Sequence, residues 1–441
     1  MFRILPTCLA ILCLFAFAPT AQCAEPRVLK AGTDAEIAKA LADAKAGDTV
    51  IVADGTYVEL LTIKTSGKPG QPIIIKAANP RKSLFARKGM AARIDGSFLR
   101  IEGLGFDSQY GDCTCVRAAG KSISFVDCEI RRAGTADGKS SGDGLQFFDS
   151  ADCLVEKCFI HHCLGSTGGE RTDSHGIRLT QCHDMTVRGC QIDLVSGDCL
   201  QVDPNRKEWD NVLIEGCKLT GGKVAANDPY AHPRYAVGAC PGENAIDTKC
   251  PTKAKTRPRI TVRDCAVFGF RGTIGNAAAF NIKEDCEAVI DRCTIYDCEI
   301  GLRLRGPARV RVTNCVLFDN DTHCRYEDNI PLLDIAHCTF GRATGKGRGV
   351  FQEQRPSPDL RVLGCLFLAE KPKQAKAASN KSAEATAFVD VAKGDYRLMA
   401  ALPLANNGPA STNTEVKVDR AGVARPPDKA PDVGAYQFRP R

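Results

Sequence analysis

Nine short segments of this chain repeat one pattern, an apolar stretch that closes on cysteine. The segments are SFVDCEI, LVEKCFI, TVRGCQI, LIEGCKL, TVRDCAV, VIDRCTI, RVTNCVL, DIAHCTF and RVLGCLF, with cysteines Cys128, Cys158, Cys190, Cys217, Cys265, Cys293, Cys315, Cys338 and Cys365. Most neighbouring cysteines lie 22 to 32 residues apart. That period indicates a solenoid and leaves too little chain for a helix in each repeat. The sequence therefore predicts an all-β fold, a single-domain right-handed parallel β-helix.

A second set of six segments aligns without gaps over seven positions: GDGLQFF, SHGIRLT, GDCLQVD, ENAIDTK, AAAFNIK and EIGLRLR. The fourth and sixth positions are almost all apolar, so they face inward, and the second, fifth and seventh positions face outward. Neighbouring strands of a sheet lie roughly 4.7 to 4.9 Å apart, so the outward side chains form one row, the polar ladder. Its fifth column is Gln146, Arg178, Gln201, Asp247, Asn281 and Arg303, and its seventh is Phe148, Thr180, Asp203, Lys249, Lys283 and Arg305.

The connections on one side of the repeat vary in length, and variable loops on a rigid scaffold usually carry binding groups. The longest, about residues 220–242, directly precedes the strand that holds Glu243 and Asp247. We expect this loop to overhang the polar ladder and to bring Tyr230, His232 and Arg234 to it.

The two ends of the chain differ in character from the repeats. Residues 1–24 combine Arg3, an apolar run and small residues, which predicts a signal peptide and a secreted, periplasmic or cell-surface protein. Residues 25–441 would then form the β-helix domain. A capping box at Thr33 predicts a short helix over about 34–46 that closes the first coil, and residues 386–438 would cap the last. No later stretch has the length of a membrane span.

Charge and composition narrow the range of partners. The formal net charge is +7 and only 6% of residues are aromatic, which favours an anionic polysaccharide over a neutral sugar. No basic helix or aromatic-basic motif suggests nucleic acid, and we expect a monomer.

Twenty-three cysteines in an exported protein first suggest disulfides. Nine of them, however, recur at one position of the repeat and would form a buried column. Cys113 with Cys115, and Cys240 with Cys250, lie off that column and are the better candidates for bridges.

Several stretches together resemble the pectate-lyase-like superfamily of right-handed β-helix proteins: AKAGDTVIVADGTY and SGKPGQPIIIKAANP near the start, the coil repeats, and GDYRL and DVGAY near the end. The resemblance covers nearly the whole chain after residue 24. Within that superfamily, GENAIDTK followed by basic segments is similar in style to polysaccharide lyase families six and nine. In those families acidic residues hold calcium and a lysine removes a proton from a uronic acid, so the resemblance implies a lyase.

β-Elimination from a uronate needs a base for the proton beside the carboxylate and a cation that neutralises the resulting carbanion. We expect Lys249 to be the base, with Lys283 as a positive neighbour. Free carboxylates would keep Lys249 protonated, so the interpretation requires Ca²⁺ on the carboxylates or another base. The expected calcium ligands are Asp198, Asp203, Glu243 and Asp247.

The remaining candidates bind substrate or transfer protons. His175 faces outward between two acidic positions, where it is either a general acid or base or a bridge between carboxylates. Guanidinium groups grip carboxylates or sulfates in a bidentate manner. The expected substrate-binding residues are Arg178, Gln201, Asn281, Arg303, Arg305, Tyr230, His232 and Arg234.

The leading hypothesis is therefore a secreted polysaccharide lyase that acts on an acidic, uronate-containing glycan. A uronate epimerase shares the proton abstraction, and a glycoside hydrolase would use two carboxyl groups across an open groove. In a non-catalytic glycan-binding solenoid, the charged residues would form only an exposed salt network that holds the coils in register.

Overall fold

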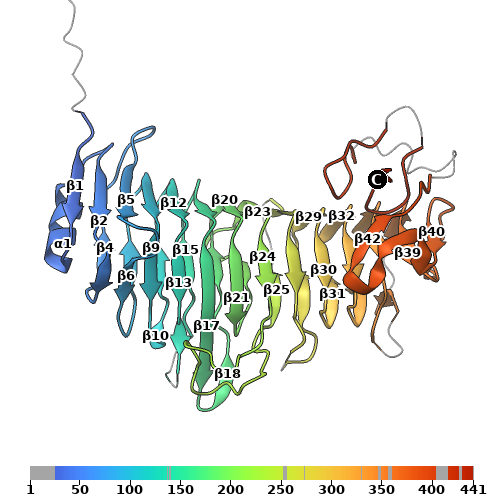
Figure 1. The fold of residues 1–441 in the computed structure, drawn as a ribbon, viewed down its shortest axis with the longest axis horizontal. Coiled ribbons are helices and arrows are strands. Elements are labelled where there is room, and N and C mark those ends of the chain that lie inside the picture. Colours follow the sequence, from blue (N-terminus) through green and yellow to red (C-terminus); the bar gives the residue numbers. More distant parts are fainter. Residues whose placement is uncertain are drawn as a thin grey trace, which may run out of the picture.

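The computed structural model describes residues 25–136, 138, 141–251, 256–272, 274–328, 330–345, 349–355, 360–403, 416–426 and 430–440. The expected signal peptide, residues 1–24, lies outside the described residues. Each coil of the chain contributes one strand to each of three long sheets, and within these sheets consecutive coils pair in parallel. The coils follow one another along a single long axis, as Figure 1 shows. The predicted parallel β-helix is confirmed.

The first sheet has 13 strands. They are β1 (Val28–Ala31), β2 (Thr49–Val52), β5 (Ile73–Ala77), β8 (Leu99–Glu102), β12 (Ile123–Val126), β16 (Leu154–Glu156), β20 (His183–Arg188), β23 (Asp210–Glu215), β26 (Arg259–Arg263), β29 (Glu287–Asp291), β32 (Arg309–Thr313), β35 (Leu332–Ala336) and β38 (Leu360–Leu363).

The second sheet has 16 strands, three of which, β10 (Gly111–Cys113), β14 (Gly134–Thr135) and β18 (Glu170–Thr172), lie off its main path. The main path is β3 (Gly55–Tyr57), β6 (Ser83–Ala86), β9 (Leu104–Asp107), β13 (Glu129–Arg131), β17 (Phe159–Thr167), β21 (Gln191–Val195), β24 (Lys218–Thr220), β27 (Ala266–Phe268), β30 (Thr294–Tyr296), β33 (Val316–Phe318), β36 (Thr339–Phe340), β39 (Leu366–Leu368) and β40 (Lys381–Ala383).

The third sheet has 11 strands and carries the polar ladder. They are β4 (Leu61–Ile63), β7 (Ala92–Ile94), β11 (Val116–Ala118), β15 (Leu145–Phe148), β19 (Ile177–Thr180), β22 (Leu200–Asp203), β25 (Asn244–Thr248), β28 (Ala278–Ile282), β31 (Ile300–Arg305), β34 (Thr322–Glu327) and β37 (Phe351–Glu353).

The register of the third sheet matches the gap-free alignment of the six segments. The fourth position pairs with itself at all five steps, from Leu145 to Ile177 and onward through Leu200, Ile246, Phe280 and Leu302. All six of these side chains are buried in the core. The far-apart fifth-column residues therefore do lie on adjacent strands of one sheet.

The cysteine column is confirmed as a buried turn ladder. In all nine repeats the residue before the cysteine adopts a left-handed conformation, with φ between 51° and 62°. That conformation turns the chain from the first sheet to the second, and it costs about 1 kcal/mol or more wherever the residue is not glycine. The cysteine then fits the crowded corner: Cys158 Sγ donates to the carbonyl of Glu156 at 3.4 Å and to that of Phe125, one coil earlier, at 3.5 Å.

The two bridges expected off the column are wrong, because all four of their cysteines are free thiols. Cys115 points into the core, while Cys113 stays half-exposed beside Ser108. Cys250 is buried, whereas Cys240 lies half-exposed in the long loop.

Both ends of the solenoid are covered. The predicted capping box forms at helix α1 (Asp34–Asp43), where Thr33 Oγ1 accepts from the Glu36 amide and Glu36 Oε2 accepts from the Gly32 amide. The helix packs against the first coils through Ile37, Ala40 and Leu41. No helix among the described residues has the length and apolarity that a membrane crossing requires.

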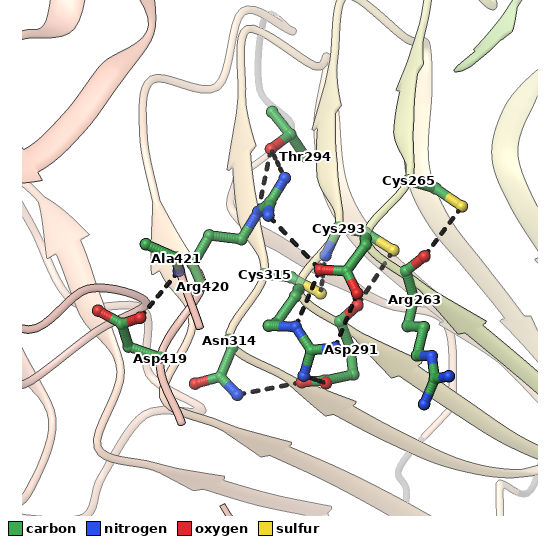
Figure 2. Close-up of polar contacts among 12 residues, drawn as sticks. Arg263, Cys265, Asp291, Cys293, Thr294, Asn314, Cys315, Asp419, Arg420 and Ala421 are labelled. Carbon is green, nitrogen blue, oxygen red and sulfur yellow. Dashed lines mark hydrogen bonds and ion pairs between the residues drawn. The ribbon is translucent and has the colours of Figure 1, made fainter. Parts of the chain in front are cut away.

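At the other end, strands β41 (Phe388–Asp390) and β42 (Asp395–Leu398) form a small antiparallel pair. Two following segments, 416–426 and 430–440, fold back along the cysteine corners. Figure 2 shows Arg420 reaching Thr294, next to Cys293, whose backbone amide donates to Cys315 Sγ. The buried Arg425 donates to Asn314 and to the Gly434 carbonyl in the same region.

Candidate active site on the third sheet

Asp247 of β25 lies at the centre of the polar ladder and is held by the next strand. Its Oδ1 accepts from Asn281 Nδ2 at 2.8 Å and lies 3.0 Å from Lys283 Nζ. Burial, followed by the nearby charge of Asp198, raises the pKa of Asp247 to about 7, against the opposing effect of Lys283 and Lys249. This carboxyl can therefore exchange a proton near neutral pH, which is unusual for an aspartate and typical of functional sites.

Lys249, the residue directly after β25, has a fixed backbone and an unpaired side-chain nitrogen. Its amide donates to the Val202 carbonyl at 2.9 Å, and its carbonyl accepts from the indole of Trp209 at 2.7 Å. The side chain is half-buried and makes no hydrogen bond or ion pair with the described residues. An amine that is positioned but unpaired can act on a substrate.

Arg178 and Asp203 form an internal ion pair across two coils. Arg178 Nε and Nη2 lie 3.0 and 2.8 Å from Asp203 Oδ2, and the hydroxyl of Thr180 donates to Asp203 Oδ1 at 3.1 Å. Asp143 also lies 3.8 Å from Arg178 Nη1. The guanidinium expected to bind substrate is thus engaged by two acids of the protein.

Three arginines converge on one carboxylate at the later rungs of the ladder. Arg303 and Arg325 donate to Glu327 Oε1 at 3.0 and 2.8 Å, and Arg305 Nε lies 3.4 Å from Oε2. Three guanidinium groups thus share one carboxylate, with Glu299 as a further negative charge near Arg325, so the cluster stays positively charged.

The sequence alignment ended one strand too early, so it missed Arg325 and Glu327. The segment THCRYE carries the same alternation: Cys324 and Tyr326 point inward, so Arg325 and Glu327 could have been placed on the polar ladder from the sequence.

His175 lies at the opposite end of the strands from Lys249. In the register of the third sheet, His175 is aligned with Asn244 of the β25 segment. Asn244 precedes Lys249 by five residues, so the aligned positions of His175 and Lys249 are about 16 Å apart along the strand direction. The His175 amide donates to Asp143 Oδ1, and the Asp198 amide donates to His175 Nδ1 at 2.9 Å. His175 Nδ1 also lies 3.3 Å from Asp198 Oδ2; when the ring is neutral it accepts from the Asp198 amide, and burial favours that form, whereas the Asp198 carboxylate favours the charged form and raises the pKa of His175 above its usual value. The structure therefore does not bring His175 and Lys249 to one reaction centre.

Gln201 also stands on the ladder, directly between Arg178 and Asp247 on the neighbouring strands. Its side chain is 2% exposed and forms no hydrogen bond with the described residues. Gln201 therefore continues the row of polar side chains, but no other described residue holds its amide group by a hydrogen bond.

The long loop does not cover the ladder, contrary to expectation. Its contacts run to the edge of the second sheet, where His232 Nε2 donates to the Thr135 carbonyl and the Tyr235 hydroxyl donates to the Gly165 carbonyl. Tyr230 packs over Arg131, and Arg234 is exposed. The loop turns back toward earlier coils, as seen at the bottom of Figure 1, because its aromatic side chains find their partners there.

The four carboxylates expected to hold calcium each face a nitrogen of the protein. Asp203 is held by Arg178, Asp247 by Lys283, Asp198 by Asn244 Nδ2 at 2.8 Å, and Glu243 lies 3.5 Å from Arg171 Nη2. Within the part of the chain that the structure describes, no three His, Cys, Asp or Glu side chains converge as metal ligands. The residues present do not fit a calcium site, and Lys283 stands where Asp247 would need a cation.

Comparison with known proteins agrees with the fold. A family model described as the right-handed β-helix region matches residues 87–236 and 252–387, and a model described as chondroitinase B matches residues 32–119. No curated protein matches the chain.

Solved structures with the same fold are distant in sequence. The family six polysaccharide lyase Pedsa3628 from Pseudopedobacter saltans is 13% identical, with 84% of this chain and 96% of that one covered and a TM-score of 0.53. The pectate lyase Pel9A is 14% identical, with 94% and 97% covered and a TM-score of 0.48. The A-module of the mannuronan C-5 epimerase AlgE4 from Azotobacter vinelandii is 13% identical, with 74% and 95% covered and a TM-score of 0.44.

The family model covers well over half of the chain, and its coils are those described above. The chain belongs to the right-handed β-helix family.

Proposed function

We propose that this protein is a polysaccharide lyase that cleaves an acidic, uronate-containing glycan by β-elimination on the third sheet. The observation that carries the proposal is the unpaired Lys249, which directly follows β25, the strand of Asp247; Lys283 lies 3.0 Å from the Asp247 carboxyl. An exported protein, as residues 1–24 suggest, would meet such a glycan outside the cell.

In the proposed reaction Lys249 Nζ removes the proton beside the sugar carboxylate. A base must be in its amine form to accept that proton, and Lys283, 3.0 Å from Asp247, places a positive charge beside the site. Asp247, with its pKa near neutrality, can carry a proton and donate a hydrogen bond to the substrate carboxylate as negative charge builds up there. The glycosidic bond then breaks, and the leaving oxygen takes a proton from water.

The arginine cluster supports an anionic polymer as substrate. Arg303, Arg305 and Arg325 lie two and three strands from β25, roughly 10 to 15 Å along the solenoid axis. A chain that runs along the ladder would place an acidic group of a neighbouring sugar there. The family six lyase, with a TM-score of 0.53, shares the fold with this chain. A shared fold is compatible with lyase chemistry but does not assign it.

The rival activities make different demands on the same residues. An epimerase would also use Lys249 but would return a proton to the sugar. A glycoside hydrolase built on Asp143 and Asp198 has less support, because both carboxylates accept internal hydrogen bonds from His175 and Asn244.

The test is to incubate the purified protein with alginate, pectate and glycosaminoglycans and to follow the ultraviolet absorbance of the unsaturated product. Growth of absorbance with at least one polymer is expected. Sugar inversion without absorbance would indicate the epimerase, new reducing ends without absorbance the hydrolase, and binding without any product the non-catalytic solenoid. Each of these three results would contradict the lyase proposal.

A further inference from the structure

Four side chains at the edge of the second sheet form a continuous row of hydrogen bonds, which we call the histidine chain. His161 Nε2 lies 3.1 Å from Glu129 Oε1, His161 Nδ1 lies 2.6 Å from His162 Nδ1, and His162 Nε2 lies 2.7 Å from Asp228 Oδ2. Both imidazole rings are buried. The proposed lyase reaction uses none of these groups.

The histidine chain joins the solenoid to the long loop. Glu129 belongs to β13, both histidines to β17, and Asp228 to the loop at 220–242. Next to Asp228, the ring of Tyr230 lies 4.6 Å from the Arg131 guanidinium, and its carbonyl accepts from the Tyr110 hydroxyl at 2.6 Å. This part of the loop is therefore docked mainly through polar and charged groups, whose strength depends on protonation.

A count of protons shows what the row requires. Each of its three contacts joins two atoms that can both be acceptors, so each contact needs one proton. Two ionised carboxylates and two neutral imidazoles together carry only two protons. If the row holds only two protons, one of the three contacts has no proton and places two lone pairs against each other. If both imidazoles are charged, the row holds four protons, and the N–H groups of His161 Nδ1 and His162 Nδ1 face each other. The intact row therefore holds three protons, whichever atoms carry them.

The surrounding charges leave the two acids as acceptors. The hydrogen bond from His161 is the main reason that the pKa of Glu129 falls to about 2. Burial raises the pKa of Asp228, but its hydrogen bonds to His162 and to the Tyr230 amide outweigh this effect and lower it.

Other charged or titratable groups face the pair. Arg131 donates through Nη1 to Glu129 Oε1 at 2.8 Å, and both Arg131 and Arg132 pair with Asp107. Burial raises the pKa of Tyr110 far above neutrality. Asp193 faces His162 from β21, yet burial lowers the pKa of His162 overall.

We propose that the histidine chain is a pH-dependent clamp, which holds the loop against the second sheet while it carries three protons and releases it when one is removed or added. At pH values above the optimum of the clamp, docking of the loop takes up one proton. The ratio of docked to undocked loop therefore falls about tenfold for each pH unit above that optimum. On the acid side both histidines of β17 are charged once the loop is undocked, and docking must then expel a proton.

Release of the loop would reach the candidate site, because the loop runs directly into β25. Its last part is tied to the body through Arg171, whose Nε donates to the Pro241 carbonyl and whose Nη2 lies 3.5 Å from Glu243. The clamp is nevertheless independent of the lyase proposal, since it concerns only where the loop lies.

Hydrogen–deuterium exchange of loop peptides covering 225–233, from about pH 5 to about pH 9 and corrected for intrinsic exchange rates, tests the clamp. We expect protection to pass through a maximum and to fall about tenfold per pH unit on its alkaline side. The loss of protection on the alkaline side distinguishes the clamp from an effect of His232, the histidine of the loop itself. His232 Nδ1 accepts from the Arg234 amide, so His232 is already neutral in the docked loop and loses no proton as the pH rises. Protection that varies less than twofold across the range, or a loop that is unprotected throughout, overturns the proposal.

Variants make the assignment specific. H162Q is expected to remove the pH-dependent protection, while H183Q, a histidine on β20 with no side-chain hydrogen bond, is expected to leave it unchanged. Peptides from the sheets report in the same experiment whether H162Q is folded. If it is not, D228N removes the loop's carboxylate without touching the solenoid and must lower protection at least tenfold at the optimum. Equal profiles for the wild type and the folded variant overturn the proposal.

Discussion

Lys283 Nζ lies 3.0 Å from Asp247 Oδ1, and Lys283 directly follows β28, the strand next to that of Asp247 in the third sheet. The sequence places the two residues 36 positions apart, and only the pairing of β25 with β28 brings them together. This contact supplies within the protein the positive charge that a metal ion would otherwise supply beside Lys249. Four further consequences of the ladder can be measured.

The first prediction concerns pH and stability. The folded-state pKa of Asp247 is raised to about 7, so this group binds a proton in the native state at pH values where the unfolded chain has lost it. The free energy of unfolding therefore falls as pH rises from about 4 to about 7, by at most about 1.4 kcal/mol per unit. Urea unfolding at several pH values should show this decline in the wild type and a smaller one in Asp247→Asn. Identical slopes would show that Asp247 ionises normally.

The second prediction concerns the Arg178–Asp203 ion pair. Arg178→Met leaves the buried Asp203 carboxylate with Thr180 as its remaining side-chain partner and should lower the free energy of unfolding by about 2 kcal/mol. The matched control is Arg259→Met, which breaks the exposed pair with Asp210 and should lower the free energy of unfolding much less. Urea midpoints of the two variants measure the difference, and equal losses would refute a structural role for Arg178.

The third prediction concerns the arginine cluster. Glu327→Gln keeps the size of the side chain but removes the only acid that Arg303, Arg305 and Arg325 share. An anionic oligosaccharide should then bind about 3- to 10-fold more tightly, with a steeper dependence on salt. Calorimetric titration at two salt concentrations measures both effects. Unchanged or weaker binding would place the substrate elsewhere.

The fourth prediction concerns metal ions. Because each expected calcium ligand faces a nitrogen of the protein, neither chelator nor added Ca²⁺ should shift the melting temperature by more than about 1 °C. Differential scanning fluorimetry with and without chelator is sufficient. A rise of several degrees with calcium would show that the carboxylates rearrange around the ion.

The periodic part of the fold could be predicted from the sequence, because successive side chains of a strand point to opposite faces of the sheet. Leu145, Ile177 and Leu200 share a column in the sequence and a row in the structure for that reason. The nine cysteines follow from the same logic, since one corner recurs in every coil.

The loop and the charge pairing could not be predicted in this way. Tyr230 docks on Arg131, about a hundred residues earlier, and nothing periodic links the two positions. The sequence likewise places Arg178 and Asp203 on one surface without saying that they neutralise each other. The position of a residue in the repeat determines which residues lie beside it in the sheet. Which of these neighbours it binds by a hydrogen bond depends on the geometry of the side chains.

The most direct test of the central claim is the rate at which Lys249→Ala forms unsaturated product, measured beside Lys121→Ala, an exposed lysine on another sheet edge. Loss of a general base should lower the rate at least 100-fold for Lys249→Ala and leave that of Lys121→Ala unchanged. A Lys249→Ala protein that forms product as fast as the wild type would contradict the account.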